Sequence, residues 1–379
     1  MDCAFITGGT GLLGVNIIRE LLQHTSARIV LLIRKPTEKK RTNLFRDLLA
    51  FNGERSLDLF SYRRIEIVDG DVTLPHLGME SSVRERLAKE VDVIYHSAAV
   101  ITLSGAETET QAVNVGGTKN VLDFALECKE KGRLDTVVHV STVAVSGNRK
   151  GVIYEGDLDT GQGFNNPYEK SKFQAEKVVG EYREKGLDIV IVRPSMVIGG
   201  SRTGFTNNFN IFYFQLRLLS QGVLDTIPFS EDATFNLIPA DRAARAICLI
   251  SFDRDSHNRN FHIVNSHEIK VKPFFEKVSD YLGYKKPEFI SSTDLHPAAF
   301  GGVRGKVLSI YYPYITAKKS FVSSNAKLAL RPYKFTWPHI TDRLLAKMLD
   351  FCIFSGYVRL GSEVAYEAGA YYAEKYIFY

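Results

Sequence analysis

Cysteine is scarce in this sequence. Its 379 residues include four, Cys3, Cys128, Cys248 and Cys352, and neighbouring ones are more than a hundred residues apart. That spacing excludes a disulfide framework and the paired cysteines of zinc or redox motifs, so we expect reduced thiols in a cytoplasmic protein. The nine histidines form no His-x-x-x-His pair, and no metal site is predicted. No apolar run approaches the ~20 residues of a transmembrane helix, and no signal-peptide pattern follows Met1.

Charge of one sign is also limited, since 48 Lys and Arg face 43 Asp and Glu, for a net charge of +5. This excludes a histone-like protein, and no nucleic-acid motif accompanies the basic and aromatic residues of 311–348. The charge is unevenly distributed, because residues 28–47 carry +5, residues 315–348 carry +6, and the remainder carries −6. We expect the first segment to bind a phosphate group and the second an acidic or phosphorylated partner.

Short apolar runs rich in β-branched residues alternate with helical patterns through the first two thirds of the chain. Because such strands are apolar on both faces, they are typical of a parallel sheet covered by helices on both sides. The pattern predicts an α/β fold, a Rossmann-type doubly wound parallel sheet. The expected strands are residues 3–7, 28–33, 64–68, 91–95, 136–140, 188–192 and 261–265.

The pattern changes after Gly199, which indicates a second part of the chain. We assign residues 1–200 to the Rossmann domain, with 236–265 returning to it. Residues 201–235 and 266–379 form the expected smaller, mostly helical substrate-binding lobe. Its aromatic residues suit an apolar acyl pocket, and core packing explains them equally well. These residues are Phe205, Phe209, Phe212, Tyr213, Phe214 and Phe229.

A glycine-rich turn follows the first expected strand and opens a helix. Gly8, Gly11 and Gly14 form a Gly-x-x-Gly-x-x-Gly loop. Missing side chains let the main chain approach a pyrophosphate, whose charge is stabilised at the helix N-terminus. In this strand–loop–helix context we predict dinucleotide binding rather than an ordinary turn. The other cofactor contacts predicted in the loop are Thr10, Leu12 and Leu13.

The residues after the second expected strand predict which dinucleotide is bound. About 20 residues beyond the last glycine, an NAD site usually has an acid for the ribose 2′-hydroxyl. Here the position holds Arg34, and Arg41 follows nearby. A guanidinium can bind a 2′-phosphate through two hydrogen bonds, so we predict NADPH, with a solvated basic loop as the alternative. Further contacts are predicted at Asp71, Val72, Ala98 and Ala99, where tight loop packing is an equally good explanation.

Tyr168 and Lys172 form a Tyr-x-x-x-Lys pair, and at this spacing both side chains share one helix face. An ammonium group near the phenol would lower its pKa from about 10 and favour acid catalysis near neutral pH. The spacing recurs at Tyr281 and Lys285, Tyr314 and Lys318, and Tyr371 and Lys375. Only Tyr168 lies between two expected strands whose ends carry Thr142 and Ser195. We therefore expect the Thr142 hydroxyl to converge with the phenol.

Taken together and in order, these motifs resemble the extended short-chain dehydrogenases/reductases over about residues 1–265. The resemblance rests on the glycine loop, His96-Ser-Ala-Ala, Asn114-Val-Gly-Gly-Thr118, Ser141-Thr142, Tyr168-x-x-x-Lys172 and Arg193-Pro194-Ser195. It implies that Tyr168 is the general acid, that Lys172 binds the nicotinamide ribose, and that Thr142 is an oxyanion partner. We place further cofactor contacts at Asn114, Pro194, Ser195 and Val197.

Within that superfamily the chain is similar to the thioester reductases and fatty acyl-CoA reductases, notably in Tyr-x-x-Ser-Lys-Phe-x-Ala-Glu176. Phe173 stands where those domains often have Trp, and Gly9 where Ala is commoner, so the exact substrate stays open. The later Tyr312-Pro-Tyr…Phe-x-x-x-Asn325 stretch resembles their small lobe, and a packed aromatic core explains it equally well.

The resemblance implies NADPH-dependent reduction of an acyl thioester, on CoA or a carrier protein, to an aldehyde, with the alcohol as an open second product. One alternative is another extended reductase, acting on a nucleotide sugar or on a hydroxysteroid-type alcohol or ketone. Another is a non-catalytic NADP-binding protein. The sequence indicates no oligomeric state.

Overall fold

The computed structural model describes residues 1–50, 62–103, 106–292, 302–316 and 318–361. The chain divides into two compact units. The first unit comprises Met1–Ser195, Ala240–Val264 and Phe321–Thr336, and the second comprises Met196–Pro239, Asn265–Ser320 and Trp337–Tyr379. The boundaries differ from the predicted domains, since residues 321–336 belong to the first unit, and residues 196–200, 236–239 and 265 belong to the second. Residues 362–379 of the predicted lobe lie outside the described residues.

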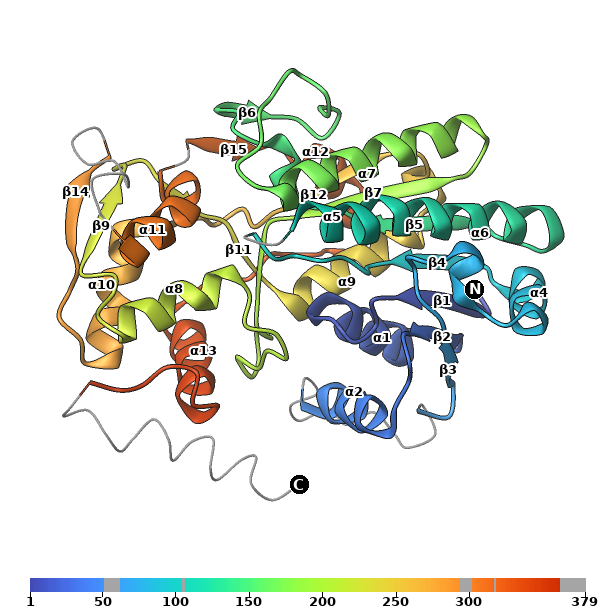
Figure 1. Ribbon diagram of the computed structural model, residues 1–379, viewed down its shortest axis with the longest axis horizontal. Coiled ribbons are helices and arrows are strands. Elements are labelled where there is room, and N and C mark those ends of the chain that lie inside the picture. The colour runs from blue at the N-terminus through green and yellow to red at the C-terminus, as the bar shows by residue number, and fades with distance from the viewer. Residues whose placement is uncertain (51–61, 104–105, 293–301, 317, 362–379) are drawn as a thin grey trace. The chain divides into compact units, whose positions relative to one another are not determined.

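The first unit is built on a seven-stranded sheet in the order β12-β7-β5-β4-β1-β2-β3. Every neighbouring pair is parallel, which confirms the predicted Rossmann-type fold (Figure 1). The central strands are almost wholly buried, as expected for runs that are apolar on both faces. Their bounds are β1 Cys3–Thr7, β2 Arg28–Ile33, β3 Ile65–Asp69, β4 Val93–His96, β5 Thr136–Val140, β7 Ile189–Pro194 and β12 Asn260–Ile263.

Helices cover both faces of this sheet. On one face, α4 (Ser81–Glu90), α6 (Gly117–Lys131) and α7 (Pro167–Glu184) share a hydrophobic core with the strands. On the other, α1 (Leu12–His24) packs against α9 (Ala240–Ser251). The remaining elements of the unit are α2 Glu38–Ala50, η1 Pro75–Gly78, α5 Glu107–Thr110, η2 Gln111–Gly116, η3 Val143–Ser146, β6 Gly151–Ile153, η4 Arg254–Ser256, α12 Ser324–Leu330 and η6 Arg331–Tyr333. Strand β15, Lys319–Phe321, lies at the boundary between the units.

The second unit has its own core, formed by short strand pairs and four helices. Strand β8 (Met196–Ile198) pairs with β11 (Leu237–Pro239), and the other pairs are β9 with β14 and β10 with β13. The bounds are β9 Thr226–Phe229, β10 Thr234–Phe235, β13 Ile269–Lys270, β14 Glu288–Ser291, α8 Ile211–Ser220, α10 Val271–Leu282, α11 Gly302–Ile315 and α13 Asp342–Phe354. Phe212 and Tyr213 are buried in this core, so packing accounts for these two of the aromatics considered for an acyl pocket.

Two further expectations from the sequence concern the state of the cysteines and the lack of a transmembrane helix. All four cysteines are free and buried. Among the helices of the described ranges, none has both the length and the apolar character needed to cross a bilayer.

Candidate cofactor and catalytic site

The glycine loop between β1 and α1 is folded so tightly that two of its glycines leave no room for a side chain. The Gly11 N–H donates to the Gly8 carbonyl at 2.9 Å. A Cβ at Gly14 would lie 2.2 Å from that same carbonyl oxygen, and one at Gly8, whose φ is +72°, would lie 2.5 Å from the Ala98 nitrogen. The loop therefore presents bare main chain, as a pyrophosphate cradle requires.

Replacing Gly14 with Ala should push the Gly8 carbonyl out of place and weaken dinucleotide binding by about 100-fold, the equivalent of one or two hydrogen bonds to a charged group. Gly180→Ala on α7 is the matched control, because a Cβ there meets nothing within 4 Å. Isothermal titration of both variants with NADPH checks this. Equal affinities for the two variants would show that the loop does not hold the cofactor.

The N-terminus of α1 is open to an anion. The helix begins at Leu12, has no acidic residue in its first turn, and has Gly11 at its N-cap with no capping side chain. The first N–H groups of a helix carry partial positive charge and favour a bound phosphate. Leu12 is buried, Leu13 is half-buried and Thr10 is exposed. The loop thus has the shape and the polarity that the sequence predicts.

Arg34 follows β2 directly, and 71% of its side chain is exposed. Its guanidinium lies 3.8 Å from the carboxylate of Asp71, which follows β3. Burial opposes ionisation of Asp71, but two hydrogen bonds from Thr73 and the charge of Arg34 lower its pKa. Arg41 lies in the first turns of α2 and is half-buried. The structure thus pairs two residues that we predicted as separate cofactor contacts.

Small residues follow β4 next to the glycine loop. Ala98 and Ala99 are half-buried, and the Ala98 N–H donates to the Thr7 hydroxyl at 3.4 Å. His96 is buried, with its ring nitrogens 2.7 Å from the Thr7 hydroxyl and 3.0 Å from the Thr118 hydroxyl. Burial and the nearby Lys172 lower the pKa of His96 to about 3. The ring is therefore neutral and joins β1, β4 and α6.

Tyr168 lies in the first turn of α7, where local sequence fixes the helix start. The Asn166 side chain caps the helix by accepting from the Glu169 N–H at 3.0 Å, and Pro167 occupies the first turn. The Tyr168 hydroxyl is hydrogen-bonded to the Thr142 side chain. Thr142, which follows β5, also accepts from the Ala144 N–H at 3.2 Å. The predicted convergence of the two hydroxyls is therefore present in the structure.

Lys172 follows one helical turn later and is buried, with its ammonium donating to the Val140 carbonyl at 2.8 Å. Burial lowers the pKa of Lys172 to about 8, against the opposing charge of Glu176. Burial also raises the pKa of Tyr168 to about 12, against the Thr142 hydrogen bond. The expectation that Lys172 lowers the tyrosine's pKa is therefore not met, because loss of hydration outweighs other influences in this structure.

The remaining predicted cofactor residues are placed as follows. The buried Asn114 uses its amide to accept from the Val100 N–H at 2.8 Å and to donate to the Ser171 hydroxyl at 2.9 Å. It lies in a π-helical segment, η2, between α5 and α6. The Val72 carbonyl accepts from the Asn120 amide. Pro194 ends β7, Ser195 follows it, and Val197 lies in β8 of the second unit.

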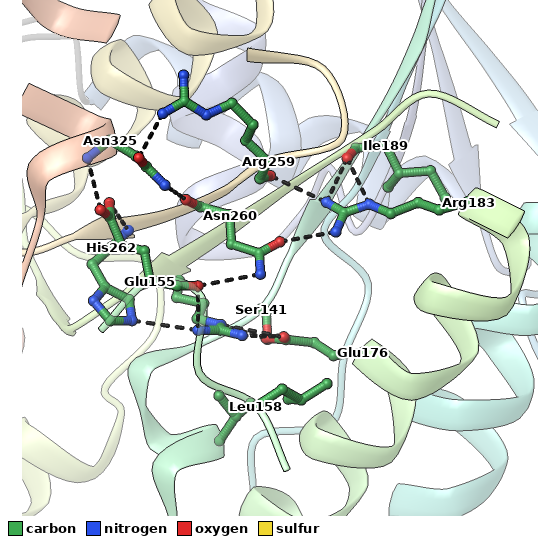
Figure 2. A network of polar contacts seen from close by, with 12 residues as sticks. Ser141, Glu155, Leu158, Glu176, Arg183, Ile189, Arg259, Asn260, His262 and Asn325 are labelled. Atoms are coloured by element: carbon green, nitrogen blue, oxygen red, sulfur yellow. Dashed lines mark hydrogen bonds and ion pairs between the residues drawn. The ribbon is translucent and has the colours of Figure 1, made fainter. Parts of the chain in front are cut away.

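Sequence reasoning missed a buried polar network that lies one helical turn from Lys172 and is centred on the ion pair of Glu176 in α7 with Arg193 in β7 (Figure 2). Both residues belong to motifs that carry the family resemblance, but nothing in their spacing in the sequence indicated that their side chains meet.

Two of the other Tyr-x-x-x-Lys pairs are placed as follows. The Tyr281 hydroxyl donates to Asp350, and Tyr371 and Lys375 lie outside the described residues. Across the part of the chain that the structure describes, no three His, Cys, Asp or Glu residues are grouped to hold a metal ion.

Comparisons with known proteins show which family and which solved structures this chain is similar to. The family described as male sterility protein, an NAD-binding family, matches residues 6–247. The terminal R domain of the myxalamid PKS-NRPS pathway superposes with a TM-score of 0.80 at 26% identity, covering 96% of this chain and 93% of that domain.

Two longer proteins also match. The L-2-aminoadipate reductase large subunit of Penicillium chrysogenum is 27% identical over 75% of this chain, which spans 21% of that protein. Fatty acyl-CoA reductase wat of Drosophila melanogaster is 28% identical over 66% of this chain, which spans 54% of that protein. The chain belongs to the male sterility protein family, and with it to the thioester reductase and fatty acyl-CoA reductase branch of the extended short-chain dehydrogenases/reductases.

Proposed function

We propose that this protein uses NADPH to reduce an acyl thioester, carried on CoA or on a carrier protein, to an aldehyde. The observation that carries the proposal is the hydrogen-bonded Thr142–Tyr168 pair beside the buried Lys172, at the same sheet edge as the glycine loop. The reductase activities in the names of the relatives support the same chemistry. The second unit is the proposed binding region for the acyl group.

The residues present fit a dinucleotide. A Cβ would fill the space at Gly8 and Gly14, and the open end of α1 favours a phosphate there. The glycine loop would hold the pyrophosphate, Arg34 and Arg41 the 2′-phosphate, and Lys172 the nicotinamide ribose. NADPH supplies the hydride when bound.

Tyr168 and Thr142 would stabilise the negative charge that develops on the thioester oxygen. A phenol with a pKa of about 12 stays protonated at neutral pH and is a hydrogen-bond donor. Two hydroxyls already oriented toward one another need little reorganisation as the charge develops. Once hydride has added to the thioester carbon, Tyr168 would protonate the resulting oxygen. The C–S bond would then break as the C=O bond re-forms, and the proton lost from that oxygen would be taken up by the leaving sulfur, which releases the thiol and the aldehyde.

Substrate screening tests the proposal directly. NADPH oxidation should be measured with acyl-CoA thioesters of several chain lengths, with an acylated carrier protein, and with UDP-sugars and a ketosteroid as competing classes. Turnover with thioesters and recovery of the aldehyde are expected. Turnover confined to a sugar or steroid would instead support another extended reductase, and cofactor binding without any turnover would support a non-catalytic protein.

Arg34→Ser should weaken NADPH binding by about 10- to 100-fold and leave NADH binding unchanged, because only NADPH has the phosphate that the guanidinium would bind. Arg46→Ser is the control, since it removes the same charge from an exposed arginine of α2 that pairs with Asp47. Fluorescence titration of each variant with NADPH and with NADH gives the four dissociation constants to be compared with those of the wild type. An equal loss for NADH and NADPH would contradict the assignment.

A further inference from the structure

Glu176 and Arg193 form an ion pair whose side chains are 0% and 1% exposed. The Arg193 guanidinium donates to both carboxylate oxygens, at 2.9 Å from Nε and 2.7 Å from the terminal nitrogen. Removing two charges from water is costly, so such a pair contributes little net stability. The presence of this ion pair one helical turn from Lys172 therefore requires another explanation.

The pair is connected to both halves of the catalytic arrangement. The Ser141 hydroxyl donates to the Glu176 carboxylate, and Ser141 immediately precedes Thr142 at the end of β5. On α7, Glu176 lies one turn after Lys172 and two turns after Tyr168, on the same side of the helix. One carboxylate thus links the strand that carries Thr142 to the helix that carries Tyr168 and Lys172.

A second layer of contacts holds the arginine in place. Arg193 also donates to the Glu155 carbonyl at 3.2 Å and lies 3.5 Å from the His262 ring. The Glu155 carboxylate accepts from the main-chain N–H groups of His262 and Asn325. Figure 2 shows Asn325, His262, Glu155, Ser141 and Glu176 as members of one continuous network of polar contacts from separate elements. Asn325 therefore belongs to this supporting network of the first unit.

The charged and titratable groups around Lys172 come from three elements. On α7 they are Tyr168 and Glu176, and on β4 and β5 they are His96 and His139. Burial and the charge of Lys172 lower the pKa of both histidines, so they are neutral at neutral pH. Of the described groups, the Glu176 carboxylate is the one whose charge favours the protonated form of Lys172.

We propose that Glu176 is a positioning residue, which holds the Ser141–Thr142 corner against α7 and places a fixed negative charge one turn from the Lys172 ammonium. This inference deepens the proposed function and rests on it for the catalytic role of Thr142 and Lys172. Arg193 holds the Glu176 carboxylate in this orientation through hydrogen bonds to both of its oxygens, which gives the buried pair a purpose other than stability.

The first test needs no substrate. NMR titration of protein labelled at the lysine Cε, with the Lys172 signal assigned from Lys172→Arg, gives the pKa of Lys172 directly. Glu176→Gln should lower that pKa by about one unit or more, because an opposite charge is lost. Since this variant leaves Arg193 unpaired, the double variant Glu176→Gln/Arg193→Met, which removes both buried charges, should shift the pKa in the same direction by a smaller amount, because loss of the arginine charge offsets part of the effect. An unchanged pKa in the folded variants would overturn the electrostatic role.

The second test uses turnover. Ser141→Ala keeps both charges and should lower kcat by about tenfold through misplacement of Thr142, with KM for NADPH and the Lys172 pKa unchanged. Tyr182→Phe is the matched control, because it removes another buried hydroxyl bond of α7, to Asp123, away from the site. Wild-type kcat in Ser141→Ala would overturn the positioning role. Absence of turnover in the wild type would instead refute the proposed function, and the NMR result would still stand.

Discussion

Tyr168→Phe is expected to reduce acyl-thioester-dependent NADPH oxidation by about 10²- to 10⁴-fold, the usual contribution of a positioned acid. The substitution removes one hydroxyl and keeps the ring, so packing at the start of α7 is retained. Thr142 would lose one of its two hydrogen-bonding partners and the developing oxyanion would lose a donor. NADPH affinity should change little, because the proposed contacts to the pyrophosphate and the 2′-phosphate lie elsewhere.

Steady-state kinetics together with direct NADPH titration would measure both effects. Tyr281→Phe is the matched control, since Tyr281 also precedes a lysine at the i, i+4 spacing, but its hydroxyl donates to Asp350 in the second unit. Its turnover should match the wild type. Undiminished turnover of Tyr168→Phe would refute the assigned role, whereas a parallel loss of NADPH affinity would indicate a binding defect.

Arg193→Ala should destabilise the first unit by about 3–5 kcal/mol. The substitution leaves the Glu176 carboxylate buried without its partner, and an unpaired buried charge costs far more than the intact pair contributes. Replacing both residues with apolar side chains of similar volume, as in Arg193→Met/Glu176→Leu, should recover much of the loss. Comparing the single with the double variant separates the free-energy cost of an unpaired buried charge from the net contribution of the ion pair to stability.

Hydrogen exchange of peptides from β5 and β7 is the suitable measurement, because it reports on the first unit, whereas the one tryptophan, Trp337, lies in the second. Lys170→Ala provides the control, since Lys170 pairs with Glu107 and both side chains are about half exposed. That variant should lose no more than about 1 kcal/mol. Similar effects of Arg193→Ala and Lys170→Ala would contradict the argument.

Much of the Rossmann sheet could be predicted because its strands have a distinctive pattern. Residues 3–7, 28–33 and 136–140 were predicted with the bounds that the structure shows. A strand buried on both faces must be apolar at nearly every position. The shared edge of parallel strands then predicts that Thr142 and Tyr168 meet, although they are distant in sequence.

The tertiary structure decided matters that depend on burial and on distant partners. The sequence by itself determined the parallel sheet, the glycine loop and the meeting of Thr142 with Tyr168, because each follows from local pattern or strand direction. Only the structure showed that Tyr168 has a raised pKa, because desolvation depends on what surrounds the phenol. Only the structure brought Glu176 to Arg193 and placed Asn325 in the first unit. Charged residues are normally solvated, so no local pattern predicts that two of them will be buried together.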